Sequence, residues 1–190
     1  HMRQDSVVVK TGDRVQAGTK IGEVGYSGMA AFPHVHLTIR NNGQALDPFG
    51  GGTCGAVGDP IWSAKALASL NYEKGEVIQS GFSPAPVELT GLETGEVRTQ
   101  NPDGGWPAMV AYAWAISLMN GDTVTVTLRG PGGIEAANTV TLDRNKAVYL
   151  LFAGKKRPAG GWPKGEYAGS LTVSNEGELR LSQEWRATLE

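Results

Sequence analysis

The segment Thr123-Val124-Thr125-Val126-Thr127-Leu128 alternates hydroxyl-bearing and aliphatic residues with a period of two. Successive side chains of a strand point to opposite faces, so this pattern predicts a strand with one buried face and one solvated face. Turn-forming residues bound the segment on both sides, at 120–122 and at 130–133. The segment therefore predicts an antiparallel sheet in this part of the chain.

Similar β-rich runs, separated by turn residues, fill residues 87–190. We expect seven strands there, at 87–92, 109–118, 123–129, 135–142, 147–152, 167–173 and 178–189. Seven short strands within about 100 residues are typical of an immunoglobulin-like sandwich of two antiparallel sheets. The region contains no cysteine pair, which excludes the antibody-type domain.

The composition limits the class of protein further. The 190 residues include 17 Lys+Arg and 19 Asp+Glu, and the formal net charge of −2 gives no long-range attraction to nucleic acid. The 27 glycines and 10 prolines favour many short strands over long helices. No run approaches the roughly 18 apolar residues of a membrane span. We therefore expect an all-β protein with no nucleic-acid partner and no membrane span.

Residues 51–86 are expected to connect two β regions, 1–50 and 87–190. Within the connector, residues 61–70 predict one short helix with Ser63 as its N-cap, and residues 83–86 predict a linker. The single cysteine, Cys54, is either a partly buried free thiol or half of a disulfide to a cysteine outside this sequence. The glycine-rich loop around Cys54 favours the disulfide.

All three histidines lie in the first 36 residues, where strands are expected at 6–10, 20–25 and 34–40. His34 and His36 are two residues apart on one of these strands, so their imidazoles point to the same side. Such a pair can place one ring on a metal and the other beside the water that attacks the substrate. A bare H-x-H pair is more often structural, but Pro33 and the tight turn at 25–28 favour a site here.

The residues around these histidines form a specific motif. Gly12-Asp13-x-Val15, Gly18-x-x-Ile21-Gly22-x-Val24-Gly25-x-Ser27-Gly28, Pro33-His34-Val35-His36-Leu37 and Asp47-Pro48 together resemble the C-terminal half of a lysostaphin/LytM-type zinc metallopeptidase domain. The resemblance covers about 50 of the 190 residues. It implies a partial β domain of the duplicated hybrid motif type, acting on peptide cross-links of bacterial peptidoglycan, in the periplasm or outside the cell.

The resemblance also implies roles for the three histidines. His36 corresponds to a zinc ligand, His34 to a catalytic residue near the attacking water, and His1 to a catalytic residue that stabilises the developing oxyanion. His1-Met2 is either native sequence or the remnant of an expression tag, and the place of His1 in the motif favours native sequence.

Two zinc ligands of that family, a His and an Asp from an upstream H-x-x-x-D motif, have no counterpart in this chain. Catalytic zinc normally needs three protein ligands. We therefore expect an incomplete, inactive piece of a peptidase, whose missing half precedes His1 or comes from another chain or copy. The alternative is a non-catalytic LytM-like module with a regulatory or cell-wall-binding role.

Three other features have less specific interpretations. Residues 9–23 also resemble the hairpin of biotinyl and lipoyl carrier domains, although Lys20 stands at the start of a strand rather than at a hairpin tip. Residues 155–157, two lysines and an arginine, predict a solvated turn, with contact to an acidic cell-wall polymer as the alternative. Core positions are expected for Trp114 and Trp185, and sugar-stacking surface positions for Trp106 and Trp162.

Overall fold

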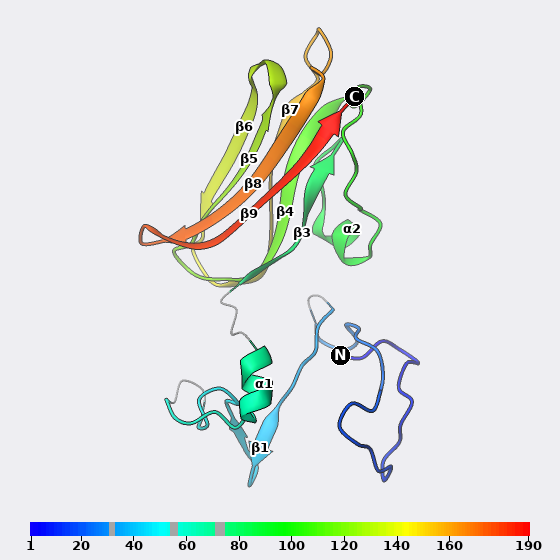
Figure 1. Cartoon of the computed structure of the whole chain (residues 1–190), viewed down its shortest axis with the longest axis vertical. Helices are drawn as coiled ribbons and strands as arrows, with labels where there is room; N and C mark the ends of the chain where they lie inside the picture. Colours follow the sequence, from blue (N-terminus) through cyan, green and yellow to red (C-terminus); the bar gives the residue numbers. More distant parts are fainter. Residues whose placement is uncertain (31–32, 54–56, 71–74) are drawn as a thin grey trace. The chain divides into compact units, whose positions relative to one another are not determined.

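The computed structural model describes residues 1–30, 33–53, 57–70 and 75–190. The chain divides into two compact units, His1–Glu73 and Lys74–Glu190. All of the sheets are antiparallel and the helices are short, which confirms the expected all-β class (Figure 1). Cys54 lies outside the described residues. None of the described helices is long and apolar enough to cross a membrane.

The second unit contains two antiparallel sheets (Figure 1). The three-stranded sheet has the order β3-β4-β7, formed by Glu76–Ser83, Ala108–Leu118 and Lys146–Lys156. The four-stranded sheet has the order β6-β5-β8-β9, formed by Ile134–Thr141, Thr123–Gly130, Gly165–Asn175 and Glu178–Leu189. A short 3-10 helix, Pro131–Gly133, leads from β5 into β6.

The alternation of aliphatic and hydroxyl-bearing residues on β5 gives the strand one buried face and one partly solvated face, as predicted. Val124, Val126 and Leu128 are buried on one face of the strand, and the threonines between them are half-buried on the other. The buried residues join one hydrophobic cluster to which β4, β7 and β8 also contribute, including Met109 and Leu171. Full burial of such a side chain stabilises the fold by about 1.5–3 kcal/mol, so this cluster holds the two sheets together.

Two expectations for the start of the second unit were wrong. Residues 76–83, expected within the connector, form β3, and a register shift between Val77 and Gln79 interrupts the alternation that would have revealed the strand. Residues 87–92, expected as a strand, instead lead into the short helix α2, Leu89–Glu93. A short apolar run does not distinguish a strand from a short helix. Here Val87 and Leu92 are buried although neither lies in a strand.

The tryptophan and basic-residue predictions were confirmed only in part. Trp114 is buried as expected, and Trp185 is half-buried against the core. Trp106 and Trp162 are also buried, because the two Gly-Gly-Trp-Pro loops meet and Trp162 Nε1 donates to the Trp106 carbonyl at 2.8 Å. They are therefore not a surface for stacking sugars. Residues 155 and 156 end β7 rather than forming a turn, although both are exposed.

The first unit contains little regular structure. Strands β1, Ile39–Asn41, and β2, Gln44–Leu46, form a hairpin, and the helix α1 spans Ala64–Ser69. Ser63 caps α1 as predicted, since its side chain accepts from the backbone N–H of Ala66.

The longer strands expected in the first unit are not formed. Residues 6–10 form no strand, and within 20–25 only Val24 and Gly25 make isolated bridges, to Met2 and His34. Of the expected strand at 34–40 only the end lies in β1. Val8 N–H donates to the Ile21 carbonyl at 3.1 Å, but Val8 and Ile21 themselves remain exposed. The segments therefore have strand-like sequences without the packed neighbours that complete a sheet.

Candidate metal centre

The three histidines converge in the first unit. His1, His34 and His36 each direct one ring nitrogen toward the others, and these nitrogens all lie within 4.8 Å of one another. The ring centroid of His1 lies 4.7 Å from that of His34 and 5.4 Å from that of His36. The structure thus brings together all three residues that the sequence singled out, beside a cavity of about 210 Å³.

Gly25 is the backbone position that joins the histidine segments. Its N–H donates to the His1 carbonyl at 2.9 Å, and its own carbonyl accepts from the His34 N–H at 3.3 Å. Gly25 is buried, and a Cβ atom there would collide with the backbone of Met2 and Arg3. The tight passage expected at residues 25–28 therefore hydrogen-bonds the backbones of both His1 and His34 through one residue.

Hydrogen bonds to the outer nitrogens orient two of the rings. His1 Nδ1 lies 2.7 Å from the Ser27 carbonyl oxygen, which only accepts, so Nδ1 carries the proton and Nε2 faces the cluster with its lone pair. His36 Nδ1 lies 3.3 Å from His1 Nε2, and His36 Nε2 lies 3.3 Å from Thr38 Oγ1. His34 and His36 lie on the same side of the chain, as the period of two predicted, and Thr38 lies beside His36.

Glu23 lines the same cavity but is engaged with basic side chains. Its carboxylate pairs with Lys20 at 3.0 Å and with Arg3 at 2.8 Å. The hydrogen bond and charge of Lys20, followed by the charge of Arg3, lower the pKa of the Glu23 carboxyl. Lys20 therefore lies in an ion pair after the turn at Gly18, rather than at the tip of a carrier hairpin.

The donor set consists of imidazoles. Among the described residues, the group of potential metal ligands at this place contains His1, His34 and His36 and no carboxylate. Imidazole nitrogens suit zinc and related transition metals, and three such ligands leave a fourth position open. The residues therefore fit a zinc ion, even though a counterpart of the upstream H-x-x-x-D pair is absent from the sequence.

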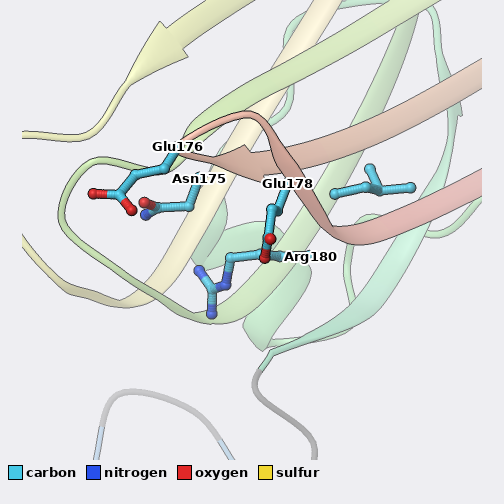
Figure 2. Close-up of a pocket in the computed structure, with 5 residues that line it drawn as sticks. Asn175, Glu176, Glu178 and Arg180 are labelled. Atoms are coloured by element: carbon cyan, nitrogen blue, oxygen red, sulfur yellow. The ribbon is translucent and has the colours of Figure 1, made fainter.

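A second hollow, of about 500 Å³, lies at the β8–β9 turn (Figure 2). Arg180, which lines it, donates to the buried carboxylate of Asp122. Burial raises the pKa of Asp122, but hydrogen bonds from Met119 N–H, Asn175 and Arg180, with the charge of Arg180, outweigh it and leave the pKa lowered. This network connects the turn at 120–122, which the sequence predicted, to the β8–β9 turn.

Histidines that converge from separate segments of a β-rich unit define a site of the kind that metal-dependent hydrolases use. Residues 1–48 match the model of peptidase family M23. The match includes all three histidines and supports a peptidase-family relationship for this part of the chain, as a hydrolase of the metalloprotease type. Peptidases of that family are generally zinc-dependent.

Proposed function

We propose that residues 1–50 are the C-terminal half of a zinc-dependent endopeptidase domain. Its substrate is the peptide cross-link of bacterial peptidoglycan, and its location is the periplasm or the cell exterior. The observation that carries the proposal is the convergence of His1, His34 and His36 within the segment that matches the peptidase family. Because this segment is related to peptidases, we assign the three imidazoles to peptide-bond hydrolysis.

Each histidine has a separate task in the proposed reaction. When bound, zinc supplies Lewis acidity toward the scissile carbonyl and toward the attacking water. His36 holds the metal, and His34 accepts a proton from the water. His1, held by its Nδ1–H on the Ser27 carbonyl, directs Nε2 toward the cluster and, when protonated there, stabilises the negative charge that develops on the carbonyl oxygen.

We propose that the first unit is incomplete as it stands and does not cleave peptide bonds. Apolar side chains that would pack against further strands are exposed, among them Val8 at 65%, Val35 at 76% and Leu37 at 57%. Their exposure is what the loss of a covering layer of strands would produce. The missing strands and the missing ligands of the H-x-x-x-D motif would both be supplied by the same upstream half, or by another chain or copy.

We propose an immunoglobulin-like fold for the sandwich of the second unit, with the role of positioning substrate or a partner. The three-plus-four arrangement of antiparallel strands supports the assignment. So does Tyr167 near the start of β8, whose hydroxyl donates to the Pro163 carbonyl at 2.9 Å. A tyrosine that bonds back to the chain four residues earlier is the tyrosine corner of such domains.

A second candidate function is a non-catalytic regulatory or cell-wall-binding module. The lack of an H-x-x-x-D motif in the chain favours it. The peptidase and the non-catalytic module predict different results when the missing zinc ligands are added. Only the peptidase would then cleave the peptide cross-link.

The test compares the 190-residue chain with a chain extended upstream by the H-x-x-x-D half of an M23 peptidase. Cross-linked peptidoglycan fragments are incubated with each, and the products are identified by mass spectrometry. We expect zinc-dependent cleavage only by the extended chain, and its loss in His34→Ala and His36→Ala. Binding of fragments without cleavage by either chain would favour the regulatory module. Cleavage unaffected by either substitution would overturn the proposal.

A further inference from the structure

We infer that His1, His34 and His36 bind one divalent transition-metal ion without any upstream residue. The inference rests on the proposed function in placing a metal at this cluster. It differs in the roles of two residues. In the 190-residue chain His1 and His34 act as ligands beside His36, whereas in the proposed peptidase they are catalytic groups and the other ligands come from the upstream motif.

The first argument is the separation of two nitrogens. His36 Nδ1 lies 3.3 Å from His1 Nε2. Zinc–nitrogen bonds of about 2.0–2.1 Å in a tetrahedral site place two ligand nitrogens about 3.3–3.4 Å apart. The two rings are thus already spaced as one edge of a tetrahedral site.

The second argument is the protonation of these rings. Because the Ser27 carbonyl holds the proton of His1 on Nδ1, the lone pair of His1 lies on Nε2, toward His36. In the metal-free chain, His36 Nδ1–H donates to that lone pair. When a metal binds both nitrogens, the His36 proton moves to Nε2, where Thr38 Oγ1 accepts it at 3.3 Å. Both rings then have the outer-nitrogen partners that orient metal-ligating histidines.

The third argument concerns His34. Its backbone N–H is bonded to the Gly25 carbonyl, which fixes the start of its side chain beside His1. Its ligand nitrogen lies within 4.8 Å of the other two, so a rotation of the ring would bring it to the spacing of a third ligand and complete the two remaining edges. The cavity beside the three rings leaves the fourth position for water or a substrate group.

The test is a titration of the 190-residue chain with Co²⁺, followed by the visible absorption bands of a four-coordinate cobalt site. We expect one Co²⁺ per chain, displaced by Zn²⁺. His1→Ala, His34→Ala and His36→Ala should each weaken binding at least about tenfold. Thr38→Val should weaken it about tenfold by removing the partner of His36 Nε2. The matched change Thr11→Val, on the turn at Gly12, should leave binding unchanged.

Unchanged binding in His1→Ala, or the absence of binding by the parent chain, would overturn the inference. Tryptophan fluorescence of the sandwich and circular dichroism serve as checks that each variant is folded. Cleavage by the extended chain without cobalt binding by the 190-residue chain would overturn this inference alone. Cobalt binding without cleavage by the extended chain would overturn the proposed peptidase function alone.

Discussion

The two units of the chain use similar β-rich sequence with different results. In the second unit, strands from Glu76 onward pair along their lengths and enclose a common core. All of the buried hydrophobic side chains among the described residues lie in this unit, from Phe82 to Leu189. Most of the exposed large hydrophobic side chains lie in the first unit; among described residues of the second, they are Ile78, Met119 and Leu179.

The difference teaches that strand-like sequence forms a strand only where another strand covers it. The extended segments of the first unit are held by local turns, such as the Lys10–Asp13 turn, in which Asp13 Oδ2 accepts from the Lys10 N–H at 3.0 Å. A few longer-range bonds, including those of Gly25, then bring the histidines together. Among the described residues, the first unit therefore contains a cluster of potential metal ligands without a core, and the second a core without a comparable cluster.

The largest expected effect is a contrast between two leucine truncations. Leu171→Ala, at a side chain that is 1% exposed in the sandwich core, should lower the free energy of unfolding by about 2–5 kcal/mol. Leu37→Ala, at a side chain that is 57% exposed in the first unit, should change it by less than about 0.5 kcal/mol. Urea unfolding followed by tryptophan fluorescence and by circular dichroism measures both. An equal loss in the two variants would show that the first unit is packed after all.

The next effect concerns the buried ion pair of the second unit. Asp122→Ala removes the carboxylate that accepts from Arg180, and the loss of hydrogen bonds to a charged group costs about 1.5–3 kcal/mol. Glu178→Ala, an exposed carboxylate on β9, is the control and should have an effect within about 0.5 kcal/mol. Equal urea midpoints for the two variants would contradict the role of Asp122 in bracing the turns.

The same carboxylate should make stability depend on pH. The pKa of Asp122 is lower in the folded chain than its ordinary value, so its contribution is present above the unfolded-state pKa of about 3.9 and is lost as the pH falls through the folded-state value. Urea midpoints should therefore fall below about pH 4, and less steeply in Asp122→Ala than in the parent chain. Parallel profiles would contradict this.

A smaller effect, confined to the first unit, is expected at Gly25. A Cβ at this position meets the backbone of Met2 and Arg3, so Gly25→Ala should separate His1 from His34 and weaken Co²⁺ binding at least about tenfold. The unfolding of the sandwich should not change. Gly160→Ala, where a Cβ meets nothing within 4 Å, is the control. Unaltered metal binding in Gly25→Ala would mean that the backbone hydrogen bonds of Gly25 do not position the histidines.

The smallest effect is expected at the hydroxyl of Tyr167. Tyr167→Phe removes the hydrogen bond to the Pro163 carbonyl and should cost about 0.5–1.5 kcal/mol. Tyr26→Phe, at an exposed side chain of the first unit, should have no measurable effect on urea unfolding. If Tyr167→Phe is also without effect, this hydrogen bond does not stabilise the second unit.

Local patterns predicted the parts of the structure that local forces determine. Strands such as β5 were found from alternation and flanking turns, and the cap at Ser63 from residue type. The bulge in β3 and the burial of Trp106 and Trp162 depend on contacts between distant segments, which no short pattern reveals. That His34 and His36 point to the same side follows from their spacing of two residues. That His1 lies beside them depends on the long-range hydrogen bonds of Gly25, and it was expected only from the family resemblance.

The most direct measurement of the central claim, that three histidines form one metal site, is nitrogen-15 NMR of the imidazoles. The chain has only three histidines, so the spectrum contains three ring systems. On addition of one equivalent of Zn²⁺, we expect all three to shift together, with His1 bound through Nε2, and the His36 proton to move from Nδ1 to Nε2. Ring signals that remain unchanged by zinc, or a shift of His36 alone, would contradict the claim.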